Sequence, residues 1–130
     1  MKVLIIDDEE DFRVVAASCL GLLGGVDVAE ASSGKVGLEM ALVEKPDVIL
    51  LDLCMPEMDG TQTLRNLREQ EGTRDVPVIF CTTKGKFDGF DEMQQLGALA
   101  VITKPFDPIR LADQIKDILK AAGHNLSELA

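Results

Sequence analysis

The chain has 130 residues, of which 46% are hydrophobic, so it fits one domain with a substantial core. Its formal net charge of −10 argues against nucleic acid as a partner, because affinity for the phosphate backbone depends mainly on Lys and Arg. The apolar runs are too short to cross a bilayer and Met1 precedes no signal-peptide pattern, so we expect neither a membrane-spanning nor a secreted protein.

Strands and helices alternate five times in the predicted organisation. Four of the predicted strands are apolar runs typical of a buried parallel sheet, and the second is a short alternating segment. Together the five units form one domain over residues 1–122, followed by a polar tail over residues 123–130. The predicted strands cover residues 2–6, 26–31, 48–51, 78–81 and 99–103.

The first, second and fourth predicted helices follow from apolar spacing and from the positions of glycine. The second covers about residues 35–44. The fourth lies between residues 84 and 96 and contains Gly85 and Gly89, so we expect it to be short or mobile. The first ends at Gly24-Gly25, and its buried stripe is predicted to consist of Phe12, Val15, Ala16, Cys19, Leu20 and Leu23.

The third and fifth predicted helices are amphipathic. The fifth starts at Asp107-Pro108 and ends at Gly123. Its buried stripe is predicted to be Leu111, Ile115, Ile118, Leu119 and Ala122. The third is predicted to turn Leu64 and Leu67 inward and Arg65, Arg68 and Glu69 outward.

The cysteines bear on the compartment. Cys19, Cys54 and Cys81 are odd in number, widely spaced and set among apolar residues. This pattern predicts reduced core thiols rather than disulfides, and hence a cytoplasmic protein.

Polar residues follow four of the predicted strands at the point where each strand ends. Asp7 and Asp8 follow the first, Asp52 the third, Thr82 ends the fourth, and Lys104 follows the fifth. Because parallel strands end at one edge of a sheet, these side chains are expected to converge there, where open α/β sheets bind their ligands.

A cluster of three carboxylates either takes up protons or recruits a cation, and we favour the cation. Oxygen ligands of this kind suit Mg²⁺, which accepts one or two protein carboxylates and keeps several waters. With the charge neutralised, Asp52 can act as a nucleophile toward phosphorus. Lys104 and Thr82 would then contact the phosphoryl oxygens.

Four motifs together resemble the receiver domain of two-component response regulators of the stand-alone, single-domain type. They are Asp7-Asp8, the run DLCMPEMDG at 52–60, Thr82-Thr83 and Lys104-Pro105-Phe106. The resemblance implies a flavodoxin-like (βα)5 fold, a doubly wound three-layer α/β/α arrangement whose parallel five-stranded sheet has the order 2-1-3-4-5. It also implies a cis bond between Lys104 and Pro105.

The resemblance further implies a phosphorylation-dependent switch. Asp52 would accept a phosphoryl group from a histidine kinase or a histidine phosphotransfer protein, with Thr82 and Lys104 on its oxygens. Mg²⁺ would be held by Asp8, Asp52 and the backbone carbonyl of Cys54, with Asp7 nearby or acting through water. The domain would catalyse only its own phosphorylation and dephosphorylation, and would not be an enzyme acting on a separate substrate.

One departure from the family concerns the output of the switch. Three residues before Lys104 the family usually has Tyr or Phe, whereas this chain has Val101. The docking face made by the fourth helix, fifth strand and fifth helix is therefore expected to change without a swinging ring. We predict that the fourth helix and residues 84–90 carry most of the change toward an unknown downstream protein.

Alternative functions remain open at this point. The chain could be a relay module of a longer hybrid kinase, which would have the same motifs. An aspartate-nucleophile phosphohydrolase is disfavoured because it would want a second acid at position 54, where Cys54 stands. A flavin-binding flavodoxin is disfavoured because the acidic run from Asp7 to Asp11 would repel the cofactor phosphate.

Overall fold

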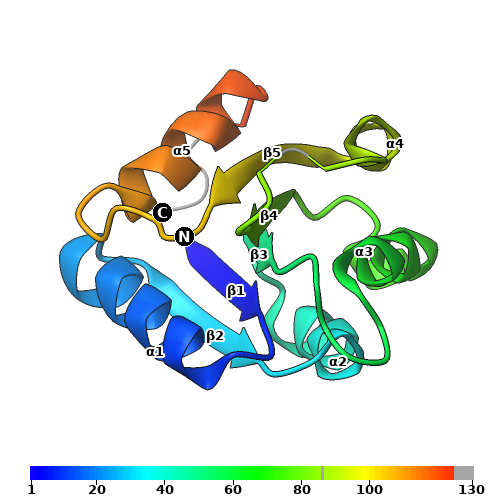
Figure 1. Cartoon of the computed structure of the whole chain (residues 1–130), viewed down its shortest axis with the longest axis horizontal. Coiled ribbons are helices and arrows are strands. Elements are labelled where there is room, and N and C mark those ends of the chain that lie inside the picture. The colour runs from blue at the N-terminus through cyan, green and yellow to red at the C-terminus, as the bar shows by residue number, and fades with distance from the viewer. Residues whose placement is uncertain (86, 125–130) are drawn as a thin grey trace.

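The computed structural model describes residues 1–85 and 87–124. Its five strands form one parallel sheet in the order β2-β1-β3-β4-β5, and Figure 1 shows helices on both sides of that sheet. The predicted doubly wound, flavodoxin-like fold is therefore confirmed. The strands are β1 (Lys2–Ile6), β2 (Asp27–Ala31), β3 (Val48–Leu51), β4 (Val78–Thr82) and β5 (Ala98–Thr103).

The helices divide between the two faces of the sheet. In Figure 1, α1 and α5 cover one face, and α2, α3 and α4 lie on the other. Short helical segments follow two of them: the π-helix η1 (Cys19–Leu23) after α1, and the 3-10 helix η2 (Glu71–Thr73) after α3. The α-helices are α1 (Glu10–Ser18), α2 (Gly34–Glu44), α3 (Gly60–Glu69), α4 (Phe90–Gln95) and α5 (Leu111–Ala121).

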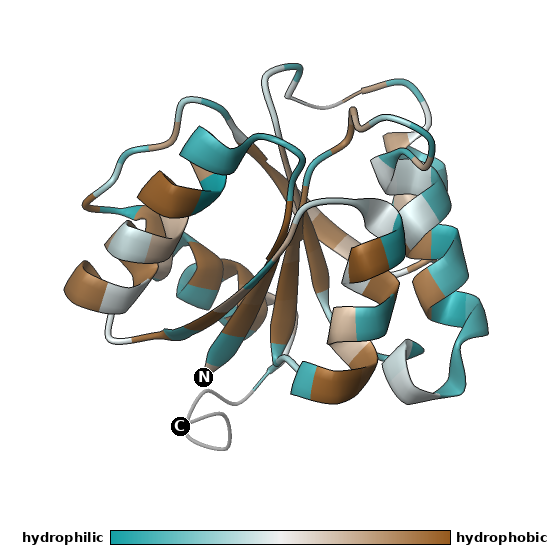
Figure 2. Ribbon diagram, turned by 90° about the horizontal axis from the view of Figure 1, so that it is seen from below, coloured by the Kyte–Doolittle hydropathy of each residue, from teal (hydrophilic) through white to brown (hydrophobic). Residues whose placement is uncertain are grey.

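The strands supply the core on both faces. Alternate residues of β1 belong to two separate apolar clusters, with Val3 and Ile5 facing α1 and α5, and Leu4 and Ile6 facing α2 and α3. All four residues of β3 are buried, as expected for a strand covered on both sides. Figure 2 shows that the central strands are mostly hydrophobic. The sheet edge that carries the polar residues is thus fixed by a rigid core.

The end of α1 differs from the prediction. The helix continues after Ser18 as η1, which inserts extra backbone per turn and rotates the following side chains. Leu23 is consequently 64% exposed, and Val15, on the outer side of α1, is 49% exposed. Both were expected in the buried stripe, whereas Ala16 and Leu20 are fully buried as predicted.

Three further details of the helices are corrected. The helix α5 begins at Leu111 rather than at Asp107-Pro108, because residues 108–110 form a turn first, and Ala122 is exposed just beyond its end. Arg68 does not point to solvent: its guanidinium donates to the carbonyls of Leu96 and Thr73. The fourth helix is short, as predicted, with six residues.

The cysteine prediction holds only in part. All three cysteines are free, but Cys54 is exposed and Cys19 is half-buried. Cys54 was expected in the core because apolar residues flank it, but it lies in the turn after β3, which faces solvent. Cys81 is buried in β4, and burial raises the pKa of its thiol to about 12.

Two parts of the sequence predictions lie outside the described residues. They are residue 86, within the segment 84–90 expected to change, and residues 125–130 of the predicted tail. Within the described ranges, no helix is both long and apolar enough to span a membrane.

Candidate functional site

The acidic corner of the molecule, formed by Asp7, Asp8 and Asp52, lies where two neighbouring strands end. Ile6 of β1 pairs with Leu51 of β3, so the residues that follow them leave the sheet side by side. The N–H of Asp52 donates to the carbonyl of Ile6 at 2.9 Å, which fixes the backbone at this point. One carboxylate oxygen from each of Asp7, Asp8 and Asp52 lies within 4.8 Å of the others. The predicted convergence of the three acids is therefore found in the structure.

Lys104 reaches this corner from the end of β5. Its Nζ lies 2.8 Å from Oδ2 of Asp7 and 3.6 Å from Oδ1 of Asp52. Exposed Glu9 is a third partner, with its Oε1 3.5 Å from Nζ. The Lys104 side chain is only 10% exposed, so its charge acts in a partly desolvated site. The peptide bond between Lys104 and Pro105 is cis, as the resemblance implied.

The pKa values of Asp52 and Lys104 are both raised, but for different reasons. Burial, followed by the charge of Asp7, raises the pKa of Asp52 to about 6, although Lys104 counteracts part of the shift. Burial alone would lower the pKa of Lys104, but its hydrogen bond to Asp7 and the charge of Asp52 outweigh it, so that pKa is raised. At neutral pH the corner therefore holds an ionised Asp52 beside a firmly protonated ammonium.

Thr82 lies at the end of β4, where it is buried. Its hydroxyl accepts a long hydrogen bond of 3.4 Å from the N–H of Lys84. Among the hydrogen bonds of the described residues, none joins Thr82 to Asp52. A backbone hydrogen bond nevertheless links Thr82 to the end of β5, because the N–H of Lys104 donates to the carbonyl of Thr82 at 2.9 Å.

The turn after β3 is held close to Asp52 by a glycine. The N–H of Gly60 donates to the carbonyl of Leu53 at 2.8 Å, and a side chain at position 60 would collide with the carbonyl of Asp52. Asp59 then caps α3 by accepting from the N–H of Gln62. A pocket of about 540 Å³ opens beside this turn, lined by Leu53, Cys54, Asp59, Thr61, Lys84, Phe87 and Asp88.

The donor set fits a divalent cation. All three acids offer oxygen, and Mg²⁺ ligands on opposite sides of an octahedron lie about 4.2 Å apart, close to the spread seen here. Three carboxylates against one ammonium leave two negative charges, which a divalent ion would balance. Asp7 is already engaged, because Oδ1 accepts from the N–H of Glu9 and Oδ2 from Lys104. Asp8 and Asp52 are therefore the freer carboxylates.

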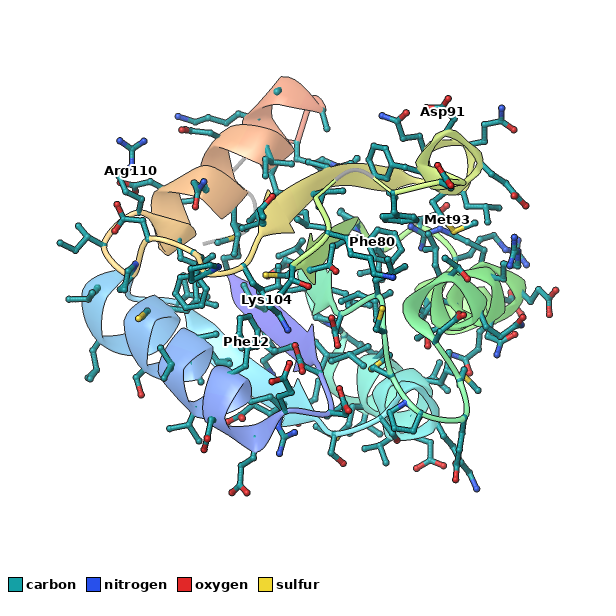
Figure 3. The ribbon with its side chains drawn as sticks, in the orientation of Figure 1. Phe12, Phe80, Asp91, Met93, Lys104 and Arg110 are labelled. Atoms are coloured by element: carbon teal, nitrogen blue, oxygen red, sulfur yellow. The ribbon has the colours of Figure 1, made fainter. Side chains whose placement is uncertain are left out.

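Sequence reasoning missed one neighbour of this corner. Phe12 was assigned to the buried stripe of α1, but its ring lies under Lys104, with Nζ 4.1 Å from the ring centroid. Figure 3 shows the two side chains together beside the end of β1. Phe106 packs edge-to-face against the same ring, with centroids 5.6 Å apart. Spacing along one helix cannot reveal a partner on another element.

Comparison with known proteins places these features in a family context. Residues 3–116 match the response regulator receiver domain. The chain is 36% identical over 126 residues to the phosphate regulon transcriptional regulatory protein PhoB of Pseudomonas aeruginosa, covering 97% of this chain and 55% of that protein. Several of the curated relatives that it matches are about twice as long as the part it aligns with.

Two other similar proteins are close to this chain in length. Sporulation initiation phosphotransferase F of Bacillus subtilis is 32% identical over 118 residues, which cover 91% of this chain and 93% of that protein. The solved structure of the chemotaxis protein CheY4 of Vibrio cholerae superposes with a TM-score of 0.83 at 30% identity. That match covers 91% of this chain and 98% of the other.

Proposed function

Because the chain belongs to the response regulator receiver domain family, we propose that it is a phosphorylation-dependent switch of a two-component phosphorelay, with Asp52 as phosphoacceptor. The observation that carries the proposal is the position of Asp52 between an acidic pair and a largely buried ammonium. This arrangement combines a nucleophile with positive charge for the oxygens of an incoming phosphoryl group.

The transfer step follows from the chemistry of the two groups. An Oδ of Asp52 attacks the phosphorus of a phosphohistidine on a histidine kinase or histidine phosphotransfer protein. The new P–O bond forms as the P–N bond breaks, and the imidazole nitrogen keeps the bonding pair and takes up a proton. The protein thus catalyses its own modification, and we propose no separate substrate.

We assign the cation site to Asp8, Asp52 and the backbone carbonyl of Cys54, with Asp7 acting through water. Support comes from the engagement of both Asp7 oxygens and from the two uncompensated charges of the corner. Bound Mg²⁺ supplies charge neutralisation for the transferring phosphoryl group. The carboxylates would hold and orient the cation, while Asp52 keeps one oxygen for the attack on phosphorus.

Lys104 and Thr82 would respond to the negative charge of the phosphoryl group on Asp52. Lys104 is already near Asp52, and it would give a hydrogen bond to one phosphoryl oxygen. Thr82 would exchange its long contact with the N–H of Lys84 for a shorter one to another oxygen. That exchange would pull on the loop before α4 and change the face formed by α4, β5 and α5, to which a downstream protein would bind.

Replacement of Asp52 by Asn tests the proposal. After incubation with acetyl phosphate and Mg²⁺, intact-mass measurement should show one added phosphoryl group on the wild type and none on Asp52→Asn. Asp59→Asn is a matched control, because Asp59 lies in the same turn but is exposed and caps α3. Phosphate retained on Asp52→Asn would assign the nucleophile to another residue.

A relay role is a second candidate. It is favoured by the similarity over nearly the full length of sporulation initiation phosphotransferase F, whose name describes phosphoryl transfer. In that role Asp52 would pass its phosphoryl group to a further histidine instead of retaining it as a signal. Incubating the phosphorylated protein with candidate histidine phosphotransfer proteins distinguishes the roles, because only a relay should lose its label to them within seconds to minutes.

A cytoplasmic location belongs to the same proposal. It is supported by the three free cysteines, of which Cys54 is exposed. An exposed free thiol close to a functional carboxylate suits a reducing compartment.

A further inference from the structure

The ammonium of Lys104 has carboxylates on one side and an aromatic face on the other. Asp7 and Asp52 provide the acidic side, and the ring of Phe12 provides the second, 4.1 Å from Nζ to the centroid. This distance is well inside the range in which a ring attracts a cation. The attraction is strengthened by desolvation, and the Lys104 side chain is only 10% exposed.

The ring is itself held in place by the loop that carries the lysine. Phe106, two residues after Lys104, meets the Phe12 ring at an interplanar angle of 87°. Such edge-to-face pairs are favourable beyond simple burial of area. Lys104 and Phe106 therefore both contact the Phe12 ring, which belongs to α1. These contacts link the helix to the start of the β5–α5 loop.

Glu9 offers Lys104 an alternative position. It lies 3.5 Å from Nζ and its side chain is 67% exposed, so a shift toward it would carry the ammonium away from Asp52. Attraction to the Phe12 ring opposes that shift, and the ring has no oxygen atom that would accept a hydrogen bond from the ammonium. The N–H groups of Lys104 then stay available for phosphoryl oxygens, and less side-chain freedom is lost when they bind.

We propose that Phe12 is a positioning residue that holds Lys104 over Asp52 through a cation–π contact and so speeds phosphorylation. The inference rests on the proposed function of Asp52. It extends that function by assigning a role to a residue on α1 that does not touch the phosphoryl group. The contact should act in the same way for any phosphodonor, because it forms within this chain.

Graded fluorination of the ring tests the proposal without changing its size greatly. Fluorine withdraws charge from the ring face, so phenylalanines with one, two and three fluorines at position 12 should weaken the contact stepwise. The rate of phosphorylation by acetyl phosphate, followed by intact mass, should fall with each fluorine and reach a loss of about fivefold for the trifluoro ring. A small donor is used because it excludes effects on the docking of a kinase.

The matched control is Phe80, a fully buried ring in β4 that packs edge-to-face on Phe87. Among the described contacts it carries no cation, so the same series at position 80 should leave the rate unchanged. Phe12→Tyr should retain most of the rate, and Phe12→Leu should lose about fivefold. A flat series at position 12, or an equal slope at both positions, would overturn the proposal and leave Phe12 with a packing role only.

A second measurement observes the contact directly. In the unphosphorylated wild type, the ε-CH₂ protons of Lys104 should show an upfield ring-current shift that disappears in Phe12→Leu. Failure of the proposed function has a different signature, namely a wild type that takes up no phosphate at Asp52. A wild type that takes up phosphate at Asp52, but shows no ring-current shift beforehand and a flat fluorine series, would refute only the role of Phe12.

Discussion

The two loops that flank Asp52 are held in different ways. At the start of the β5–α5 loop, Lys104 is bound to Asp7 at 2.8 Å and rests on Phe12. At the start of the β4–α4 loop, the Thr82 hydroxyl makes one long contact of 3.4 Å within its own loop. The same loop contains Gly85 and Gly89 at positive φ and leads into a helix of six residues.

This difference separates two tasks of the site. Groups fixed before the reaction stabilise developing charge without reorganising, which is the more effective arrangement for catalysis. Groups that gain a partner only afterwards supply the differential interaction on which a conformational shift depends. We therefore assign preparation of the reaction to the Lys104 side and transmission of the signal to the Thr82 side.

Loss of Lys104 should have the largest effect on the reaction. Lys104→Gln removes a positive charge that is in place beforehand, and we expect phosphorylation by acetyl phosphate to slow about a hundredfold. Thr82→Val removes a neutral donor that is recruited later, and should slow the same step by less than about tenfold. Time courses by intact mass measure both rates. A larger effect at Thr82 would reverse the division of tasks.

Mg²⁺ should stabilise the fold in a pH-dependent manner. Without metal, the folded-state pKa of Asp52, about 6, lies above its ordinary value of 3.8, so the folded protein binds more protons in that window. The contribution of Asp52 to stability is therefore largest below pH 4 and is lost as the pH rises to about 6. Mg²⁺ needs the ionised carboxylate, so its stabilisation should grow through the same window.

Melts with and without Mg²⁺ at several pH values measure this linkage. At a concentration about a hundredfold above Kd the gain should approach about 2.7 kcal/mol at pH 7. Asp52→Asn is the control, since it should flatten the pH dependence of the gain. Coincident wild-type melts at pH 7 would refute the cation site at this corner.

A smaller effect is expected from the contact between α3 and α4. Arg65 and Glu92 form an ion pair of 2.7 Å, but their side chains are 39% and 62% exposed. Arg65→Gln should therefore lower global stability by only about 0.5 kcal/mol, while amide exchange in α4 becomes faster. Lys2→Gln is a matched control, because it breaks the Lys2–Glu44 pair far from α4. Equal exchange in both variants would mean that α4 is held by other contacts.

Much of the fold and site could be predicted from strand ends. A strand buried on both faces is recognised from its apolar run, and the parallel topology then brings Asp7, Asp52 and Lys104 to one edge. The position of Leu23 could not be predicted, because a single π-turn rotates every later side chain. The contact between Phe12 and Lys104 was equally hidden, since it depends on side-chain angles of residues from two distant elements.

The central claim is that phosphorylation of Asp52 is transmitted through the β4–α4 loop and α4, while the Lys104 side is already arranged. Hydrogen exchange on the protein with and without beryllofluoride, a phosphoryl mimic, compares both regions in one sample. We predict altered protection in residues 87–96 and little change in residues 104–110. In Asp52→Asn, beryllofluoride should alter protection in neither region. Unaltered exchange in residues 87–96, together with a large change in residues 104–110, would contradict the account.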